Sequence, residues 1–449
     1  MKRYADFFSH FTSNDKRKSA RKRERERERI MSLFALERQT TTSASSASRW
    51  RLLRTRGGVK EAATARRSRE GRFTRAARNT VREEEEGEND DGSSKRTVVE
   101  LFSGIGGMRL ALEDANVLWN GKDDGDGAAA AVHFIAVDNN CNANAVYRAN
   151  FCSCSSSSSS EVLEGNIESI DVERLLYSSC EILTMSPPCQ PYTRKGKKER
   201  ENDARSTALA RIIDAFEDAG EEEALPKRIL LENVVGFELG TERERFISSL
   251  EKHRYHVKEY VGLSPETMLG VPVKRPRYYL LARREKFGSF DINSFESPSV
   301  EDIAKYLDGE IEIGLEIEKK KIEKYWKFFD VVNVASSRNV ASTFTSGYGK
   351  TVFSGSYILF DNCDIAKRDV HANNAYRLVK DDNYESDEQF AERVSRSMRY
   401  FSPRELCRLH GIKEQFVFPS SLSKRQQYKL IGNGISVNVV SKLLEYLFK

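Results

Sequence analysis

Residues 98–108 join an apolar run, a glycine-rich turn and the start of a helical pattern. The segment reads Val-Val-Glu-Leu-Phe-Ser-Gly-Ile-Gly-Gly-Met and predicts a strand that ends in a tight turn before a helix. From residue 97 onward, further strand-like segments alternate with helical ones. This alternation predicts an α/β domain with a largely parallel sheet that helices cover on both faces. Sites in such folds lie at the carboxyl ends of the strands.

The expected elements can be placed along the chain. Strands are expected at 97–102, 132–138, 181–185, 228–232, 255–261 and 277–283, and helices at 107–115, 142–150, 204–218 and 242–253. Thr241 and Glu244 form a capping-box pattern for the last of these helices. Excursions rich in small and polar residues at 120–131 and 152–160 predict surface loops. The closing stretch of the chain has helical apolar spacing and is expected to pack back on the sheet.

A cysteine follows one of the expected strands in a proline-rich loop. Cys189 stands in Ser-Pro-Pro-Cys-Gln at 186–190, directly after the apolar run 182–185. Prolines restrict the backbone, so the thiol is placed at a strand end, where a nucleophile would be useful. An isolated cysteine is more often an inert buried residue. Glu232 also follows an apolar run, so its carboxylate and the Cys189 thiol would lie at one edge of the sheet. This placement favours a nucleophile over an inert cysteine.

These motifs occur with others in the order of a known family. The chain resembles the cytosine-5 methyltransferases that use S-adenosylmethionine, and most of all the tRNA-aspartate cytosine methyltransferases once classed as eukaryotic DNA methyltransferases. The resemblance spans 97–449 and depends on the motifs at 98–108, 187–194, 232–238, 399–405, 430–433 and 439–443. It implies a Rossmann-like S-adenosylmethionine-dependent methyltransferase core with a smaller target-recognition lobe.

The resemblance also implies a domain organisation. A disordered, basic, low-complexity tail is expected at 1–96, a catalytic Rossmann-like domain at 97–284, a target-recognition lobe at 285–398 and a segment completing the catalytic domain at 399–449. Residues 1–96 hold 26 of the chain's 73 Lys and Arg but only 15 of its 68 Asp and Glu. The remaining residues hold 47 basic and 53 acidic side chains. The basic character therefore belongs to the tail.

The tail supports more than one interpretation. The Lys/Arg-rich run 16–29 is typical of a nuclear-localisation or RNA-binding patch, and the acid-poor stretch 38–82 is typical of an organelle transit peptide. A solvated tail without either role is the remaining alternative. We expect a cytoplasmic or nuclear protein, with organelle targeting through the tail as the other possibility.

The resemblance assigns the chemistry to four residues. Cys189 would add to carbon-6 of cytosine, which activates carbon-5 toward a methyl sulfonium. Glu232 would donate a proton to ring nitrogen-3, which requires its pKa to lie above the ordinary value. Arg275 and Arg277, two residues apart on an extended segment, would point the same way and hold the base carbonyl and a phosphate.

The glycine turn would hold the cofactor. Its glycines allow close backbone approach, the helix start would present amides to the methionine carboxylate, and Asp138 would accept the ribose hydroxyls. Asn139 or Ile167 would flank the adenine. The implied cofactor residues are Phe102, Gly104, Gly106, Gly107, Met108, Asp138, Asn139, Ile167, Ser186 and Asn433. A nicotinamide oxidoreductase would also fit the turn, but it gives Cys189 and Glu232 no joint task.

The resemblance implies tRNA as the substrate, at cytosine 38 in the anticodon loop of tRNA-Asp. Loop bases are already exposed, so presenting one to the enzyme costs less than extruding it from duplex DNA. The implied substrate contacts are Gln190, Arg194, Lys195, Thr343, Phe344 and Thr345, with Lys197 and Lys198 beside them. DNA methylation is the first alternative, and a catalytically weak nucleic-acid-binding homologue is the second. Thr343 stands where this branch usually has cysteine.

Other partner classes have little support in the sequence. Seven cysteines and six histidines show no metal-ligand spacing, so no metal is expected. No apolar run reaches the ~18 to 20 residues that span a bilayer. We therefore expect a soluble monomer without a membrane partner.

Overall fold

The computed structural model describes residues 96–118, 131–152, 158–178, 180–188, 204–220, 224–288, 298–310, 312–334, 340–360, 366–369, 375–380 and 385–449. They belong to the second of the two units into which the chain divides, Asn89–Lys449. Residues 1–95 of the tail expected at 1–96 and most of the excursion at 120–131 lie outside the described residues, whereas Arg96 already belongs to the first strand.

The larger sheet has a mixed but mainly parallel topology. Within the described ranges its strands are β1 (Arg96–Leu101), β2 (Val132–Asp138), β3 (Ser158–Glu164), β4 (Ile182–Met185), β5 (Arg228–Val234), β6 (His256–Leu263) and β7 (Arg277–Arg283). Their order is β3-β2-β1-β4-β5-β7-β6. The first five strands of the chain, β1 to β5, run parallel to one another, whereas β7 is antiparallel to both of its neighbours, β5 and β6. The predicted bounds 132–138 and 277–283 are confirmed.

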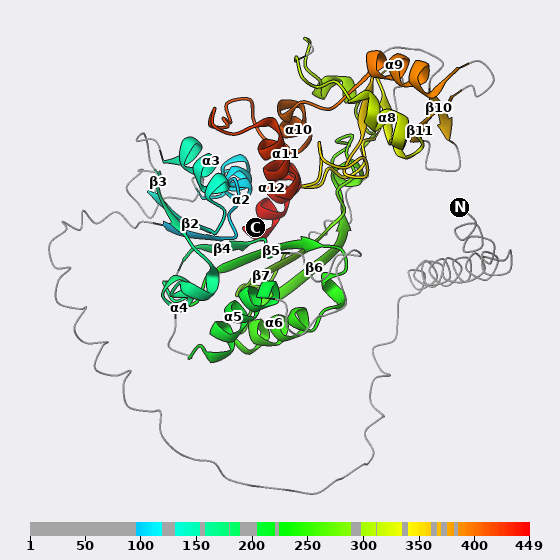
Figure 1. Ribbon diagram of the computed structural model, residues 1–449. Helices are drawn as coiled ribbons and strands as arrows, with labels where there is room; N and C mark the ends of the chain where they lie inside the picture. Colours follow the sequence, from blue (N-terminus) through cyan, green and yellow to red (C-terminus); the bar gives the residue numbers. More distant parts are fainter. Residues whose placement is uncertain are drawn as a thin grey trace, which may run out of the picture. The chain divides into compact units, whose positions relative to one another are not determined.

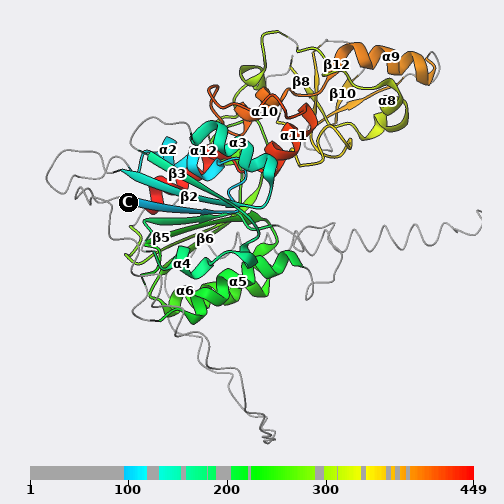
Figure 2. The same ribbon diagram turned by 60° about the vertical axis from the view of Figure 1, so that its left-hand side comes forward.

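Helices cover both faces of this sheet. Figures 1 and 2 show α2 (Gly107–Ala115), α3 (Cys141–Phe151) and α12 (Val437–Leu447) on one face and α4 (Val172–Leu176), α5 (Ala204–Asp218) and α6 (Thr241–Lys252) on the other. Val98 and Val99 of β1 are fully buried in these two different layers, because side chains alternate along a strand. Helix α12 packs against α2 and β7, so the end of the chain returns to the large sheet.

A smaller sheet lies in the region where a separate lobe was expected. Its described strands are β8 (Val331–Asn333), β9 (Tyr357–Leu359), β10 (Ala366–Asp369), β11 (Ala375–Leu378) and β12 (Met398–Arg399), in the order β10-β11-β8-β9-β12. Helices α8 (Lys319–Tyr325) and α9 (Asp387–Ser397) pack on each other beside it. The remaining helices are α7 (Pro265–Met268), α10 (Pro403–Leu409) and α11 (Lys424–Asn433).

A buried ion pair joins the end of the smaller sheet to α10. Arg399 donates from both terminal nitrogens to the Glu405 carboxylate, at 2.8 and 2.7 Å. Glu405 also closes a capping box with Ser402, and it accepts the Asp308 amide at 2.9 Å. The fully buried Glu405 carboxylate is thus paired with a cation and satisfied by hydrogen bonds. The residues of the motif at 399–405 therefore stabilise the fold.

The loop predicted at 152–160 is wrong at its end. Ser158 begins β3 and pairs with Val132 of β2 along a continuous parallel register. Serine has little preference for strands, but Arg109 of α2 donates to the hydroxyls of Ser158 and Ser160. These bonds compensate for the missing apolar side chains at the sheet edge.

The capping box predicted at 241–244 is also wrong. Helix α6 begins at Thr241 itself, with Gly240 as its N-cap and no side-chain bond to the cap. The Thr241 hydroxyl donates to the neighbouring Glu242 carboxylate at 3.2 Å instead. The pattern was therefore displaced by one position from a true N-cap.

Candidate active site

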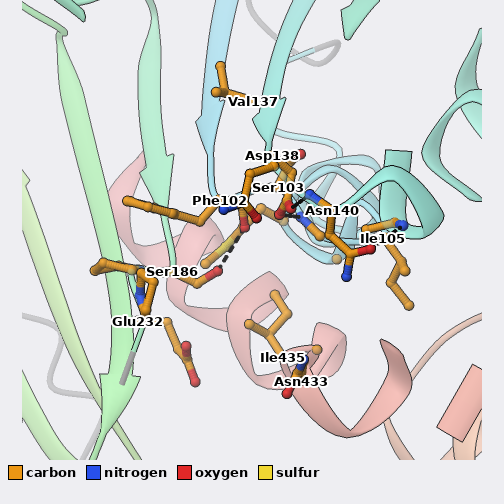
Figure 3. A pocket seen from close by; sticks show the side chains of 18 of the residues that line it. Phe102, Ser103, Ile105, Val137, Asp138, Asn140, Ser186, Glu232, Asn433 and Ile435 are labelled. Atoms are coloured by element: carbon orange, nitrogen blue, oxygen red, sulfur yellow. Dashed lines mark hydrogen bonds between the residues drawn. The ribbon is translucent and has the colours of Figure 1, made fainter. Parts of the chain in front are cut away.

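A cavity of about 980 Å³ opens at the carboxyl ends of β1, β2, β4 and β5. Figure 3 shows side chains from the turns after these strands, together with the end of α11, around one space. This volume is within the range of small-molecule sites. The lining includes the expected residues Phe102, Gly104, Gly107, Met108, Asp138, Asn139, Ile167, Ser186, Glu232, Arg275, Arg277 and Asn433.

The turn after β1 has an unusual backbone that opens toward the cavity. Phe102 and Gly104 both have positive φ, 57° and 54°. A Cβ added to Gly104 would meet no atom within 4 Å, so this side of the turn is open to a ligand. The carbonyl of Phe102 accepts a hydrogen bond from the Ser186 hydroxyl at 3.2 Å, which links the turns after β1 and β4.

Gly106 packs closely against α3, and its expected part in cofactor binding stays a prediction. Its φ is 85°, and an added Cβ would lie 2.3 Å from the Phe151 ring of α3. Gly106 does not line the cavity. Gly107 does line it, and there a Cβ would approach the Ile435 side chain to 2.8 Å. The two glycines therefore allow α2 to approach α3 and the segment after α11 closely.

Asp138 is the last residue of β2, and its carboxylate accepts hydrogen bonds from main-chain amides in the turns after β1 and β2. One oxygen accepts the Gly104 amide and the other the Asn140 amide, each at 2.8 Å. Burial raises the pKa of this carboxyl group, while those amides oppose the rise. Each carboxylate oxygen has a further lone pair, so the group keeps capacity to accept ligand hydroxyls. Asn139 beside it donates to Asn166 at 2.8 Å.

Glu232 lies near the end of β5 and is 8% exposed. Its carboxylate is 3.1 Å from Nε of Arg277. Burial raises the pKa of Glu232, and the cations Arg277 and Arg275 oppose that rise. The direction of this shift is the one that a proton-donating carboxyl group requires.

Arg275 and Arg277 do not act as a matched pair. Arg277 pairs with Glu232, but Arg275 is 3% exposed and donates to main-chain carbonyls of Phe344, Gly432 and Gly434. Arg275 thus connects the start of β7, the smaller lobe and the end of α11. These bonds position the three segments, and the expected contact of Arg275 with the base carbonyl stays a prediction.

The nucleophile loop begins at the cavity. Cys189 lies outside the described residues, as do Gln190, Arg194, Lys195, Lys197 and Lys198. Pro187 and Pro188 immediately before Cys189 line the same cavity as Glu232. The Asn233 side chain donates to the Pro187 carbonyl at 3.3 Å, so the residue after Glu232 is tied to this loop. The described part of this loop, up to Pro188, therefore lies at the cavity.

The expected substrate contacts at 343–345 differ in accessibility. Phe344 is 1% exposed and packs edge-on against Tyr348 and Phe401, so its ring belongs to the core, and the expected substrate contact at this residue stays a prediction. The Thr343 hydroxyl donates to the Lys274 carbonyl at 2.7 Å. Thr345 has an exposed side chain. A hydroxyl at 343 can make this local bond, which suits the position in place of the family cysteine.

Several cavity residues were missed by sequence reasoning. They are Ser103, Ile105, Val137, Asn140, Asn166, Asn233, Gly434 and Ile435. Most flank a residue that was predicted, and Asn140 carried a signal of its own because it is the N-cap of α3. Ile435 had no such signal, since its place depends on the return of the chain to the large sheet.

The described part of the chain has no group of three or more metal-ligating side chains that could hold an ion. None of its helices combines the length and apolar character needed to cross a membrane.

Most of the chain matches a known protein family. A family model described as C-5 cytosine-specific DNA methylase matches residues 96–449. The chain belongs to this family. Family membership supports a methylase, so the nicotinamide alternative is not supported.

Relatives of this methylase cover nearly all of its described region. The tRNA (cytosine(38)-C(5))-methyltransferase of Homo sapiens is 29% identical over 418 residues, covering 78% of this chain and 99% of the relative. The Spodoptera frugiperda enzyme of the same name is 31% identical over 360 residues, with coverage of 78% and 99%. A crystal structure of a Spodoptera frugiperda DNMT2 variant has a TM-score of 0.62 at 27% identity and covers 79% of this chain and all of that one.

Proposed function

We propose that this methylase transfers a methyl group from S-adenosylmethionine to carbon-5 of cytosine 38 in the anticodon loop of tRNA, with tRNA-Asp as its substrate. The observation that carries the proposal is the buried Glu232–Arg277 pair, which shares one cavity with Gly104 and Asp138. The relatives from Homo sapiens and Spodoptera frugiperda are named for this reaction, and the chain spans 99% of each.

The reaction begins with activation of the base. The Cys189 thiolate forms a bond to carbon-6 of cytosine while Glu232 donates a proton to ring nitrogen-3, which gives a neutral enamine. Carbon-5 would then take the sulfonium methyl group, and the donor would leave as a neutral thioether. Loss of the carbon-5 proton to water or hydroxide and cleavage of the bond between Cys189 and carbon-6 restore the double bond and the free thiolate. Return of the nitrogen-3 proton to Glu232 restores the neutral base and the protonated carboxyl group.

The surroundings of Glu232 suit its part in this sequence. An ordinary glutamate with a pKa near 4.3 is protonated in about one molecule in 500 at pH 7, and burial increases that fraction. Arg277 fixes the carboxylate orientation through its 3.1 Å contact. The side chain of Arg277 is 14% exposed, so it can also meet a substrate group at the cavity mouth.

The cavity residues fit the proposed methyl donor. S-adenosylmethionine, when bound, supplies an electrophilic methyl group. Asp138 would accept hydroxyl groups from the ribose, and the open side of Gly104 allows the ligand to approach the turn. Ile167 is 3% exposed and offers an apolar wall to a purine ring.

Methyl transfer from tritiated S-adenosylmethionine tests the substrate. The acceptors are a tRNA-Asp transcript, the same transcript with uridine at position 38, and duplex DNA. We expect label in the first acceptor alone. DNA is the second candidate because the family model carries that description, and preferential labelling of the duplex would overturn the proposal.

A covalent trap distinguishes an enzyme from a nucleic-acid-binding homologue. With 5-fluorocytosine at position 38, fluorine replaces the carbon-5 proton and cannot leave as a cation after methyl transfer, so the Cys189 adduct should accumulate as a shifted band on a denaturing gel. Cys189→Ala should abolish the band. Cys141→Ala changes an exposed free cysteine elsewhere and should preserve it. Absence of an adduct in the unaltered protein would favour the homologue without catalysis.

A further inference from the structure

Two exposed aromatic rings contact each other on the smaller lobe. Phe328 follows α8 at the end of a short helical turn, Trp326–Phe328, and Phe353 lies in the segment between β8 and β9. Their exposed fractions are 53% and 62%, and the ring centroids are 5.4 Å apart at 61°. Exposed apolar residues are usually scattered singly, so a paired site with two accessible ring surfaces suggests a binding role.

The surroundings of this aromatic pair are positively charged. Residues 319–330 contain five lysines against two carboxylates. Lys319 is paired with Glu392, and Lys321 donates to the Tyr400 hydroxyl at 2.8 Å. The other three lysines of the segment are exposed, as is a further lysine three residues before Phe353; they are Lys320, Lys324, Lys327 and Lys350.

This charge pattern favours a nucleic acid over a protein partner. Cores of protein interfaces are depleted of lysine, whereas single-stranded nucleic acids are bound by aromatic rings beside cations that track the phosphates. Bases of a duplex are stacked inside the helix and cannot reach such rings, but bases of an RNA loop can.

The loop that carries Phe353 is anchored at the cavity rim. The Thr345 amide donates to the carbonyl of Ser354, the residue after Phe353, at 2.9 Å. Thr345 in turn packs against Gly432, where an added Cβ would lie 2.4 Å from the Thr345 carbonyl carbon. Because Gly432 lines the cavity, a short run of direct contacts connects the aromatic pair to the site.

We propose that Phe328 and Phe353 form a stacking platform for an unpaired base that flanks the target cytosine in the RNA loop. Lys320, Lys324 and Lys327 contact the adjoining phosphates. The platform deepens the function proposed above and depends on it for the identity of the RNA. Stacking on either ring tolerates any base, so the platform contributes affinity and orientation and does not read sequence.

Binding of the tRNA-Asp transcript to the full chain tests the platform. The double variant F328A/F353A should bind about 10- to 100-fold more weakly, as expected when stacking is removed. F328Y/F353Y keeps both π-faces and should bind within about threefold of the unaltered protein. I313A removes another exposed apolar side chain, 88% exposed, and should have no effect. Calorimetric binding of S-adenosylmethionine should be equal in all variants and reports folding.

Two further readouts separate stacking from charge. With 2-aminopurine beside position 38, binding should change its fluorescence in the unaltered protein and in F328Y/F353Y, but not in F328A/F353A. The slope of log Kd against log salt should be unchanged in F328A/F353A. In the variants K320A, K324A and K327A, that slope should fall by roughly 0.7 for each phosphate that the replaced lysine no longer neutralises.

The outcomes distinguish this proposal from the proposed function. If F328A/F353A binds the transcript as tightly as the unaltered protein while tRNA methylation persists, the platform is wrong and the function stands. If the unaltered protein shows the stacking signal on RNA but labels DNA alone, the platform stands and the proposed function fails. Equal weakening in I313A would also overturn the platform.

Discussion

Glu232 combines burial with a close cation, and this balance sets its protonation. Burial raises its pKa more than Arg277 and Arg275 lower it. A carboxyl group in this state can donate a proton at a pH where an exposed glutamate cannot. The pH dependence of methyl transfer is therefore a direct report on this residue.

Replacing Glu232 with Gln should lower the methyl-transfer rate by about 10²- to 10⁴-fold, the usual contribution of a proton donor. In the unaltered protein, kcat/KM should fall as pH rises above the pKa of Glu232, because the ionised carboxylate has no proton to give. Glu232→Gln should lack this decline. Rates measured from pH 6 to 9 check the prediction, and a variant that keeps the falling limb would contradict it.

The two glycines of the first turn should respond differently to alanine. Gly106→Ala places a Cβ 2.3 Å from the Phe151 ring, so it should lower the melting temperature by several degrees. Gly104→Ala meets no neighbour, so it should cost only about 1 to 2 kcal/mol of backbone strain and weaken S-adenosylmethionine binding. Thermal melts with and without the cofactor compare them. Equal melting temperatures would argue against the packing role of Gly106.

At this scale, residues that end strands were predictable and residues that fill space were not. Asp138 and Glu232 follow apolar runs, so their place at one sheet edge could be inferred from the pattern. Gly106 and Phe344 have roles set by neighbours distant in sequence, Phe151 and Phe401, which no local pattern reveals.

A buried carboxylate lies where β1, α2 and α3 meet. Glu100 of β1 is 1% exposed and accepts a hydrogen bond from the Tyr147 hydroxyl of α3 at 3.2 Å. Burial raises its pKa to about 8, although Arg109, Tyr147 and the first amides of α2 oppose the rise. The other carboxylate oxygen has no hydrogen-bond partner within the described residues. The joint between these elements is therefore sensitive to protonation.

Glu100→Gln should change how stability depends on pH. Between the ordinary pKa of 4.5 and the folded value of about 8, the native state keeps a proton that the unfolded state releases. The free energy of unfolding should thus fall as pH rises through this interval, by up to about 1.4 kcal/mol per pH unit. Glutamine removes this slope, so the variant should gain stability relative to the unaltered protein as pH rises.

Melts of both proteins from pH 5 to 9 measure the difference. If the stability of both proteins changes with pH in the same way, Arg109 keeps the Glu100 carboxylate ionised throughout, and its effect on the pKa of Glu100 exceeds that of burial.

Elements with strong periodicity could be predicted, and those held by side-chain bonds could not. The helices at 107–115 and 204–218 have these bounds in the structure because apolar spacing alone defines them. Strand β3 was missed because its first residues are serines whose partner, Arg109, lies about fifty residues earlier. Short strands of the smaller sheet, such as Val331–Asn333, also give too little pattern.

Charge divides the whole molecule unevenly, and this predicts the effect of removing the tail. Residues 1–88 hold 24 Lys and Arg against 13 Asp and Glu, while the family model begins at residue 96. A variant that starts at residue 89 should keep its turnover at saturating tRNA but show a smaller salt dependence of Kd. Filter binding at 50 to 200 mM salt checks this, and an unchanged slope would exclude tail contacts. The nuclear and organelle assignments of the tail stay predictions.

The lobes are joined through the same residues that border the site. Arg275 reaches Phe344 in the smaller lobe and Gly432 at the end of α11. The order of motifs indicated two lobes, but only the folded chain shows that one guanidinium contacts both. Arg275 therefore ties both segments to the start of β7, two residues before Arg277, the partner of Glu232.

Strand β3 tolerates a change in chain length just before its first residue, Ser158. Ser158 opposes Val132, and the register is maintained downstream by Val162 and Leu163 opposite Ala136 and Val137. Residues 155–160 are all serine, so a protein with one serine added or removed before Ser158 still places a serine opposite Val132. We expect such a change in length to leave the fold intact, whereas an insertion after Glu164 would displace Asn166 and Ile167 from the cavity.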